Sequence, residues 1–381
     1  MTVSTHSTWA VRSQFFAAGA LFATWGVHVP TVKAHYGLSE PTLALAMLAA
    51  GVGSITGLTQ AGQVIGRLGP RSVALGAGLA AAVAIALLLA TPFYAVLLAL
   101  MFTFGLASSL FDVSINVAAS ELERQADRPV MSGFHGLFSL GGMAGAGLGS
   151  AVHNLGLTAP QHLLLAAGAC GALTVWGCLH LHGGRDAEAG RHGMVLPRGV
   201  LGLIGVLAAL GLLCEGAIYD WSVLYMRESL QADTATAALA YAFFSGAMAA
   251  TRFGGDWVRA RFSSVRLVQA CGGLSAVGMA LTLASGQPVA ALLGFALIGL
   301  ALGNVVPVLF SAAARVPGVA PADGIAAVAA LGYFGMMVGP PMIGLVADWH
   351  SLTAGLALVM LFGAVLSLAA RRALRHDQPT A

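Results

Sequence analysis

Charged residues are scarce in this sequence of 381 residues, where Asp, Glu, Lys and Arg together make up 9% of the chain. Soluble domains carry about 25% charged residues. A water-soluble fold needs charged side chains to cover its surface, so this scarcity disfavours nearly all ordinary soluble enzyme folds. The net charge of +3 gives no indication of a nucleic-acid partner, and we expect none.

Cofactor and metal motifs are also missing. The four cysteines all fall in apolar segments at spacings that fit no metal site, so we expect no disulfide and no bound metal. The sequence has no Walker phosphate loop, which excludes ATP as the energy source, and no Gly-x-Ser-x-Gly nucleophile motif. We therefore expect neither a cofactor nor an enzymatic activity.

Long apolar runs are what the sequence has in abundance, since 58% of its residues are hydrophobic and the mean hydropathy is +0.84. A membrane-spanning helix needs about 20 apolar residues, so the chain has room for about twelve spans with their loops. The runs do not alternate as barrel strands do. We predict an all-α integral membrane protein with twelve transmembrane helices at 13–32, 41–64, 72–90, 93–118, 132–153, 161–181, 199–222, 234–257, 265–285, 288–311, 324–347 and 352–370.

The basic residues predict the orientation of these spans. Of the 18 lysines and arginines, all except Lys33, Arg227 and Arg252 fall in tails or loops on one side of the predicted membrane. Basic residues gather on the cytoplasmic side of membrane proteins. We therefore expect a multi-pass protein of the bacterial inner membrane, with both termini in the cytoplasm.

The chain is expected to consist of two related halves. A polar segment at 183–198 separates residues 1–182 from residues 199–381, and its glycines and charges are typical of a cytoplasmic linker. The halves echo each other, because residues 62–71 and 252–261 both place glycines before a basic turn, and residues 105–107 and 299–301 both read Gly-Leu-Ala. Weak internal symmetry of this kind is typical of secondary transporters.

On these features the sequence resembles the major facilitator superfamily. The resemblance rests on the Gly66-Arg67 and Arg71 turn after the second span, its counterpart at Asp256 and Arg259, and the long central loop. It implies two six-helix bundles that expose a site to either side in turn, and charged turns that close the cytoplasmic side. The gating residues implied are Arg67, Arg71, Arg252, Asp256 and Arg259. The superfamily usually has Asp where this chain has Gly66, so the latch is expected to depend mostly on Asp256.

Four segments resemble the bacterial fucose-permease-like branch more narrowly: 111–116, 132–139, 215–221 and 252–256. This resemblance implies a sugar as the solute, although no residue pattern establishes one. Drug–proton antiporters of the superfamily typically carry Gly-Pro in the fifth span. Here Gly339-Pro340 lies in the eleventh span, which weighs modestly against that reading. We expect Pro307 and Pro340 to bend their helices.

Polar residues inside the first half form one candidate site. Asp112 and Asn116 are four residues apart on one helical face, and His135 lies about one turn into the next span. An Asp112–His135 pair could carry a proton near neutral pH, because each partner shifts the other's pKa. The alternative is a fixed polar clamp between the two spans.

A second candidate site lies in the seventh span, beyond the membrane midplane. Glu215 shares a face with Tyr219, and Asp220 is offset from it. A carboxylate removed from water suits a group that binds and releases a proton in each cycle. The resemblance implies that the first and seventh spans approach each other outside, which makes His28 and Lys33 candidate partners of Glu215 and Asp220. The alternative is an outer-gate ion pair without a role in coupling.

Arg252 lies one turn before Asp256, so the two are expected to pair in a structural or gating role, unless Arg252 balances an anionic solute. Other polar and aromatic residues either line the pathway or only pack. The candidates for the substrate cavity are Trp25, His28, Gln60, Asn116, Tyr219, Asp220, Tyr241 and Asn304.

We predict a secondary active transporter that moves a small polar solute by alternating access, as a proton-coupled symporter. Glu215, Asp112 and His135 are the candidates for proton coupling. The partners expected are the solute, the proton and the lipid bilayer, with the protein acting as a monomer. Two alternatives stay open: a proton-coupled efflux antiporter for drugs or metabolites, and a membrane sensor that uses this fold without transporting.

Overall fold

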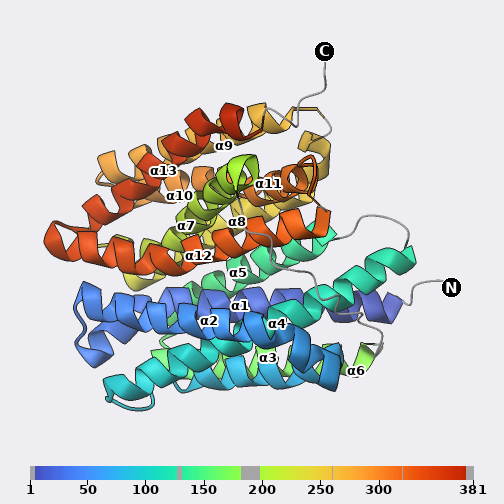
Figure 1. Cartoon of the computed structure of the whole chain (residues 1–381). Helices are drawn as coiled ribbons and strands as arrows, with labels where there is room; N and C mark the ends of the chain where they lie inside the picture. Colours follow the sequence, from blue (N-terminus) through green and yellow to red (C-terminus); the bar gives the residue numbers. More distant parts are fainter. Residues whose placement is uncertain (1–4, 127–130, 182–197, 260, 320, 375–381) are drawn as a thin grey trace. The chain divides into compact units, whose positions relative to one another are not determined.

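The computed structural model describes residues 5–126, 131–181, 198–259, 261–319 and 321–374, and these residues form thirteen α-helices without any strand (Figure 1). The chain divides into two compact units: unit 1, Met1–Ala189 with Asp233–Ala242, and unit 2, Gly190–Ala232 with Phe243–Ala381. The predicted linker at 183–198 lies, apart from Arg198, outside the described residues.

Each predicted span corresponds to a helix, with the tenth divided in two. The first half contains α1 (Thr5–Tyr36), α2 (Glu40–Leu68), α3 (Pro70–Ala86), α4 (Tyr94–Ala126), α5 (Met131–Asn154) and α6 (Ala159–His180). The second half contains α7 (Gly199–Glu228), α8 (Thr234–Arg259), α9 (Ser264–Ala284), α10 (Pro288–Leu302), α11 (Val305–Ala313), α12 (Pro321–Trp349) and α13 (Leu352–Ala373). The predicted all-α membrane fold is confirmed.

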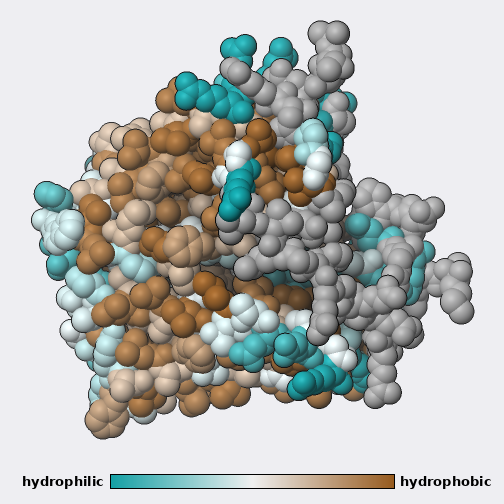
Figure 2. Space-filling model, in the orientation of Figure 1, coloured by the Kyte–Doolittle hydropathy of each residue, from teal (hydrophilic) through white to brown (hydrophobic). Residues whose placement is uncertain are grey.

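Apolar side chains cover much of the visible surface between the helix ends (Figure 2). Leu164 and Leu179 on α6 and Val277 on α9 are among the large hydrophobic residues that are more than half exposed. Nine helices of the described residues are long and apolar enough to cross a membrane. Such a surface is stable in lipid and not in water, so the chain is a multi-pass membrane protein.

Helix pairing inside one half repeats inside the other. In unit 1, α1 packs on α5 and α6, and α3 packs on α4 and α6. In the second half, α7 packs on α12 and α13, and α9 packs on α10 and α13. Because α12 and α13 are the eleventh and twelfth spans, the four pairs match one for one. This correspondence supports the internal repeat that the glycine motifs indicate.

Glycines allow the closest of these contacts. A Cβ added to Gly141 on α5 would lie 2.1 Å from the carbonyl oxygen of Phe16 on α1, and one added to Gly335 on α12 would lie 2.4 Å from the carbonyl oxygen of Ala209 on α7. Small residues at helix contacts let backbones approach, and packing is the main driving force for association in lipid. Both matching helix pairs therefore have a glycine at a point of close backbone approach.

The tenth span is broken between α10 and α11 at Gly303 and Asn304. Pro307 lacks the N–H that would bond to the carbonyl of Gly303 in a regular helix, which weakens the chain at this place. On α8, Thr251 Oγ1 donates to the carbonyl of Leu300 in the last turn of α10, at 3.1 Å. The bend expected at Pro307 is thus a break before it, whereas α12 continues through Pro340.

Candidate functional site

An ion pair lies buried in unit 2. Arg252 Nη2 on α8 lies 3.2 Å from Glu215 Oε1 on α7, and the two side chains are only 15% and 7% exposed. Charges inside a membrane protein are costly unless they are paired or face water, and they usually mark functional sites. Spacing along the sequence predicts a pair between Arg252 and Asp256 on one helix. It gives no indication of the contact between Arg252 and Glu215 on another helix.

An aromatic side chain, Tyr219, lies next to the Glu215–Arg252 pair. Tyr219, one turn after Glu215, is buried and donates its hydroxyl to the sulfur of Met248 on α8 at 3.6 Å. Its ring meets Phe244 edge to face, with 4.9 Å between the ring centroids. Tyr219 therefore lies beside the pair, as its position one turn from Glu215 predicts.

Asn304 brings a polar amide to the α10–α11 break. The residue is 5% exposed, and a Cβ added to Gly255 on α8 would lie 2.7 Å from its Oδ1 atom. On α7, a Cβ added to Gly211, one turn before Glu215, would lie 3.0 Å from a methyl group of Val305 at the start of α11. The break thus packs against α7 and α8 within one turn of Glu215 and Arg252. Polar residues at broken helices often form solute sites in transporters.

The polar site of unit 1 is simpler. Asn116 Nδ2 donates to Asp112 Oδ1 at 3.1 Å and to the Asp112 carbonyl at 2.9 Å, so the predicted common face of these residues is confirmed. His135 packs edge-on against Phe15 of α1, with 5.2 Å between ring centroids. Within the described part of the chain, the contacts of Asp112 do not include the expected pairing with His135.

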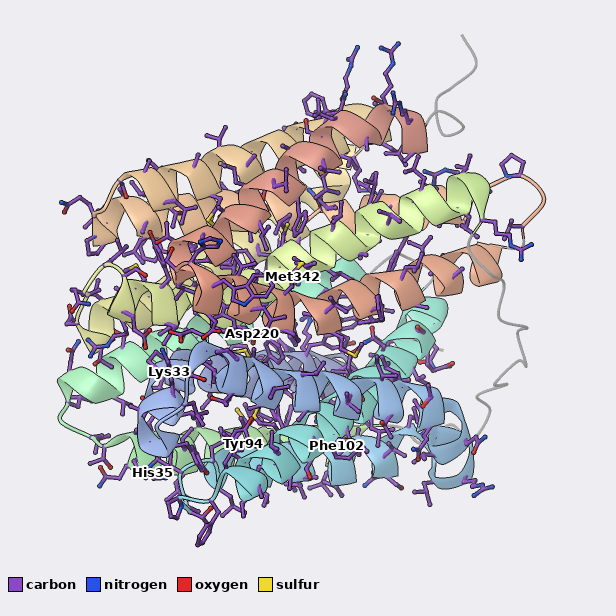
Figure 3. The ribbon with its side chains drawn as sticks, turned by 60° about the vertical axis from the view of Figure 1, so that its left-hand side comes forward. Lys33, His35, Tyr94, Phe102, Asp220 and Met342 are labelled. Carbon is purple, nitrogen blue, oxygen red and sulfur yellow. The ribbon has the colours of Figure 1, made fainter. Side chains whose placement is uncertain are left out.

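Two pairs form near the C-terminal end of α1, the end at which Figure 3 labels Lys33. Lys33 Nζ lies 2.9 Å from Glu40 Oε1 on α2. His28 Nε2 lies 2.8 Å from His162 Nδ1 on α6, and both imidazoles are buried. Each of these pairs lies within unit 1. The contact expected between Lys33 and a carboxylate of the seventh span stays a prediction.

The other candidate residues differ in their exposure. Trp25 and Tyr241 are buried, Asp220 on α7 is half-buried, and Gln60 is exposed. The gating candidates Arg67 and Arg71 are exposed at the α2–α3 turn, and Arg259 donates to Ser311 Oγ on α11 at 2.5 Å. The side chain of Asp256 lies outside the described residues, so its expected pairing with Arg252 stays a prediction.

Sequence reasoning missed His162 and Thr251. His162 follows Gln161 in the first turn of a mostly apolar span, at the same membrane depth as His28, and this matching depth was the available signal. Thr251 gave no signal, because its role depends on a helix break that the apolar run conceals. Across the residues that the structure describes, no three His, Cys, Asp or Glu side chains gather to hold a metal ion.

Comparison with known proteins agrees with this fold. Residues 13–323 match the Major Facilitator Superfamily. An uncharacterised MFS-type transporter of Yersinia pestis is 32% identical over 367 residues, which cover 96% of this chain and 95% of the relative. Membrane protein MosC of Rhizobium meliloti is 31% identical over 363 residues, which cover 94% of this chain and 88% of that protein.

Solved structures share the fold at low identity. A crystal structure of the nucleoside transporter NupG has a TM-score of 0.78 and 11% identity, with 96% of this chain and 99% of that chain covered. The D-xylose-proton symporter has a TM-score of 0.79 and 13% identity, with coverages of 97% and 99%. The family match over most of the sequence, the relatives and the repeated helix pairing lead to one conclusion: the chain belongs to the Major Facilitator Superfamily and is one of its membrane transporters.

Proposed function

We propose that the protein moves a small polar solute, of which a sugar is the leading example, together with a proton. It works by alternating access in the bacterial inner membrane, as a monomer with both termini in the cytoplasm. The buried Glu215–Arg252 pair is the observation that carries this proposal. The name of the D-xylose-proton symporter describes proton-coupled transport by that protein. At 13% identity, its similarity to this chain supports the shared fold alone.

Glu215 is the group of this pair that can change its charge. An arginine stays protonated at every accessible pH, so a proton can enter the pair only at the carboxylate. The ionised pair holds Arg252 against α7 by a charge-assisted contact of 3.2 Å. Protonation of Glu215 weakens this contact and frees guanidinium donors for a solute. Proton binding and solute binding at this place therefore favour each other.

The polar groups around the pair suit a hydroxylated solute. The amide of Asn304 both donates and accepts hydrogen bonds, and the Tyr219 hydroxyl does the same. The Asn304 amide faces Gly255 on α8, where an added Cβ would lie 2.7 Å from its Oδ1 atom. Sugar hydroxyls match such donors and acceptors, and aromatic rings offer faces for sugar rings. The structural break beside them gives the site a backbone that can change shape.

Reconstitution into liposomes tests the proposal. Wild-type protein is expected to accumulate one member of a panel of radiolabelled pentoses, hexoses and nucleosides when the outside is acidified, and Glu215→Gln is expected to lose that accumulation. Glu228→Gln is the matched control, because Glu228 ends the same helix and is exposed. Equal accumulation by wild type and Glu215→Gln would contradict the role of this carboxylate. Movement of trapped drugs out of the liposomes under the same pH gradient would favour the efflux alternative.

A further inference from the structure

The His28–His162 pair is a second titratable site, separate from the one proposed for coupling. It joins α1 to α6 inside unit 1, with 2.8 Å between His28 Nε2 and His162 Nδ1 and 5.0 Å between the ring centroids. His28 is 7% exposed and His162 is 1% exposed. On the far side of each ring, His28 Nδ1 lies 3.5 Å from Thr31 Oγ1, and His162 Nε2 is buried with no hydrogen-bond partner in the described structure.

Local sequence holds His162 in this position. Thr158 caps α6 with Gln161, whose Oε1 accepts from the Thr158 N–H at 2.8 Å, and this capping box sets the first turn. Gly149 on α5 then leaves room for the ring, because a Cβ there would lie 3.1 Å from His162 Cε1 and 2.9 Å from Val27 Cγ1. The pair is thus built by three helices and is not an accident of one rotamer.

Proton counting shows what the pair can bind. When the pair is neutral, one ring donates across the 2.8 Å contact, and the remaining proton lies either on His162 Nε2 or on His28 Nδ1. One added proton fills the vacant outer nitrogen, and both neutral forms give the same cation. A second added proton would place N–H groups on both facing nitrogens and break the contact. The hydrogen-bond count therefore limits the closed pair to one added proton, and the cost of burying that charge decides whether the pair stays closed.

The surroundings favour the neutral form while the pair is buried. Burial disfavours a charged imidazolium, and His162 lies in the first turn of α6, where the helix dipole also disfavours a cation. The titratable groups at this end of α1, α6 and the helices packed on them include Lys33, His35, Tyr94 and His153, together with Tyr36, whose hydroxyl donates to the Leu88 carbonyl. Lys33 is engaged by Glu40, His35 contacts the Thr91 carbonyl, and Tyr94 donates to the Thr42 carbonyl. The side chain of His153 lies outside the described residues.

We propose that His28 and His162 form a proton-binding site that holds the adjoining ends of α1 and α6 together when neutral and releases them when protonated. Water must reach the rings for the cation to be stable, so proton uptake and separation of these helix ends occur together. Acid therefore favours the separated arrangement, and alkali favours the closed one. This site responds to pH whether or not a solute is bound, and it does not depend on Glu215.

Spin labels on α1 and α6 can test this in protein held in lipid nanodiscs, with no solute present. Labels at Ala34 and Leu164, which are both exposed, report the distance between the two helix ends once the four native cysteines have been replaced. We expect the distance to increase as the pH falls from about 8 to about 5, around the ordinary imidazole range. The variant His28→Gln/His162→Gln keeps polar side chains in both positions and should remove this response.

Nitrogen-15 NMR of histidine-labelled protein provides an independent readout. Signals assigned to His28 and His162 by the single Gln variants should shift together toward the protonated form, over the same pH range in which the spin-label distance increases. His180→Gln is the control, since His180 is half-buried at the opposite end of α6, where its Nδ1 lies 2.8 Å from the Trp176 carbonyl oxygen. The proposal is overturned if both rings keep neutral signals down to pH about 5. An equal distance change in wild type and the double Gln variant would overturn it as well.

Discussion

Replacing either member of the Glu215–Arg252 pair should destabilise the protein far more than replacing both. At the observed 3.2 Å, the attraction at an effective dielectric constant of about 20 is about 5 kcal/mol before the cost of removing both groups from water. Removing one partner leaves a buried charge and typically costs about 3–5 kcal/mol, whereas replacing both is often close to neutral. We therefore expect a strongly non-additive double-mutant cycle.

The assay is reversible unfolding in mixed micelles, monitored by tryptophan fluorescence, for Glu215→Gln, Arg252→Gln and the double variant. The Lys33–Glu40 pair is the matched control. Its contact is shorter, at 2.9 Å, but its side chains are 14% and 28% exposed, so its coupling should be about 0.2–1 kcal/mol. Additive effects at Glu215 and Arg252, or a coupling no larger than that of the control pair, would refute the reasoning that burial makes this pair important.

Three further predictions concern single positions. Gly141→Ala should separate α5 from α1 and lower the unfolding temperature by several degrees, whereas Gly147→Ala on the same helix meets open space and should not; equal thermal melts would contradict this. Asn304→Leu should abolish solute-induced thermal stabilisation with little change in apo stability, and unchanged stabilisation would exclude its amide from the site. Hydrogen bonds from Thr236 lower the pKa of Asp233, so this cap stabilises α8 at pH values above the ordinary Asp pKa and loses its effect as the pH falls. Asp233→Ala should therefore lower the free energy of unfolding by about 0.5–2 kcal/mol at pH 7 and leave it unchanged in strong acid. Unfolding measured at both pH values tests this.

The positions of the helices could be predicted from sequence because apolar length alone determines where a chain can cross a membrane. The predicted span at 199–222 corresponds to α7, which continues to Glu228. The predicted span at 288–311 covers α10 and α11 but hides the break at Asn304. Hydropathy is unaffected by such a break, since the residues on both sides remain apolar.

Contacts between helices were predicted less well than contacts within a helix. Asp112 and Asn116 were correctly placed together, because residues four apart share a face in any helix. The partners Glu215–Arg252 and His28–His162 join different helices, and their choice depends on how each helix is rotated about its axis. That rotation is set by close approaches such as Gly141 to Phe16 and Gly149 to His162, which spacing within one helix does not reveal.

The most direct test of proton-coupled transport measures proton and solute movement together. Liposomes containing the wild-type protein and a trapped pH-sensitive dye receive the solute identified by the uptake screen, with no pH gradient imposed beforehand. Inward movement of the solute should acidify the interior in proportion to the amount taken up, and Glu215→Gln should show no acidification. Solute uptake by the wild-type protein without any change of internal pH would contradict the account.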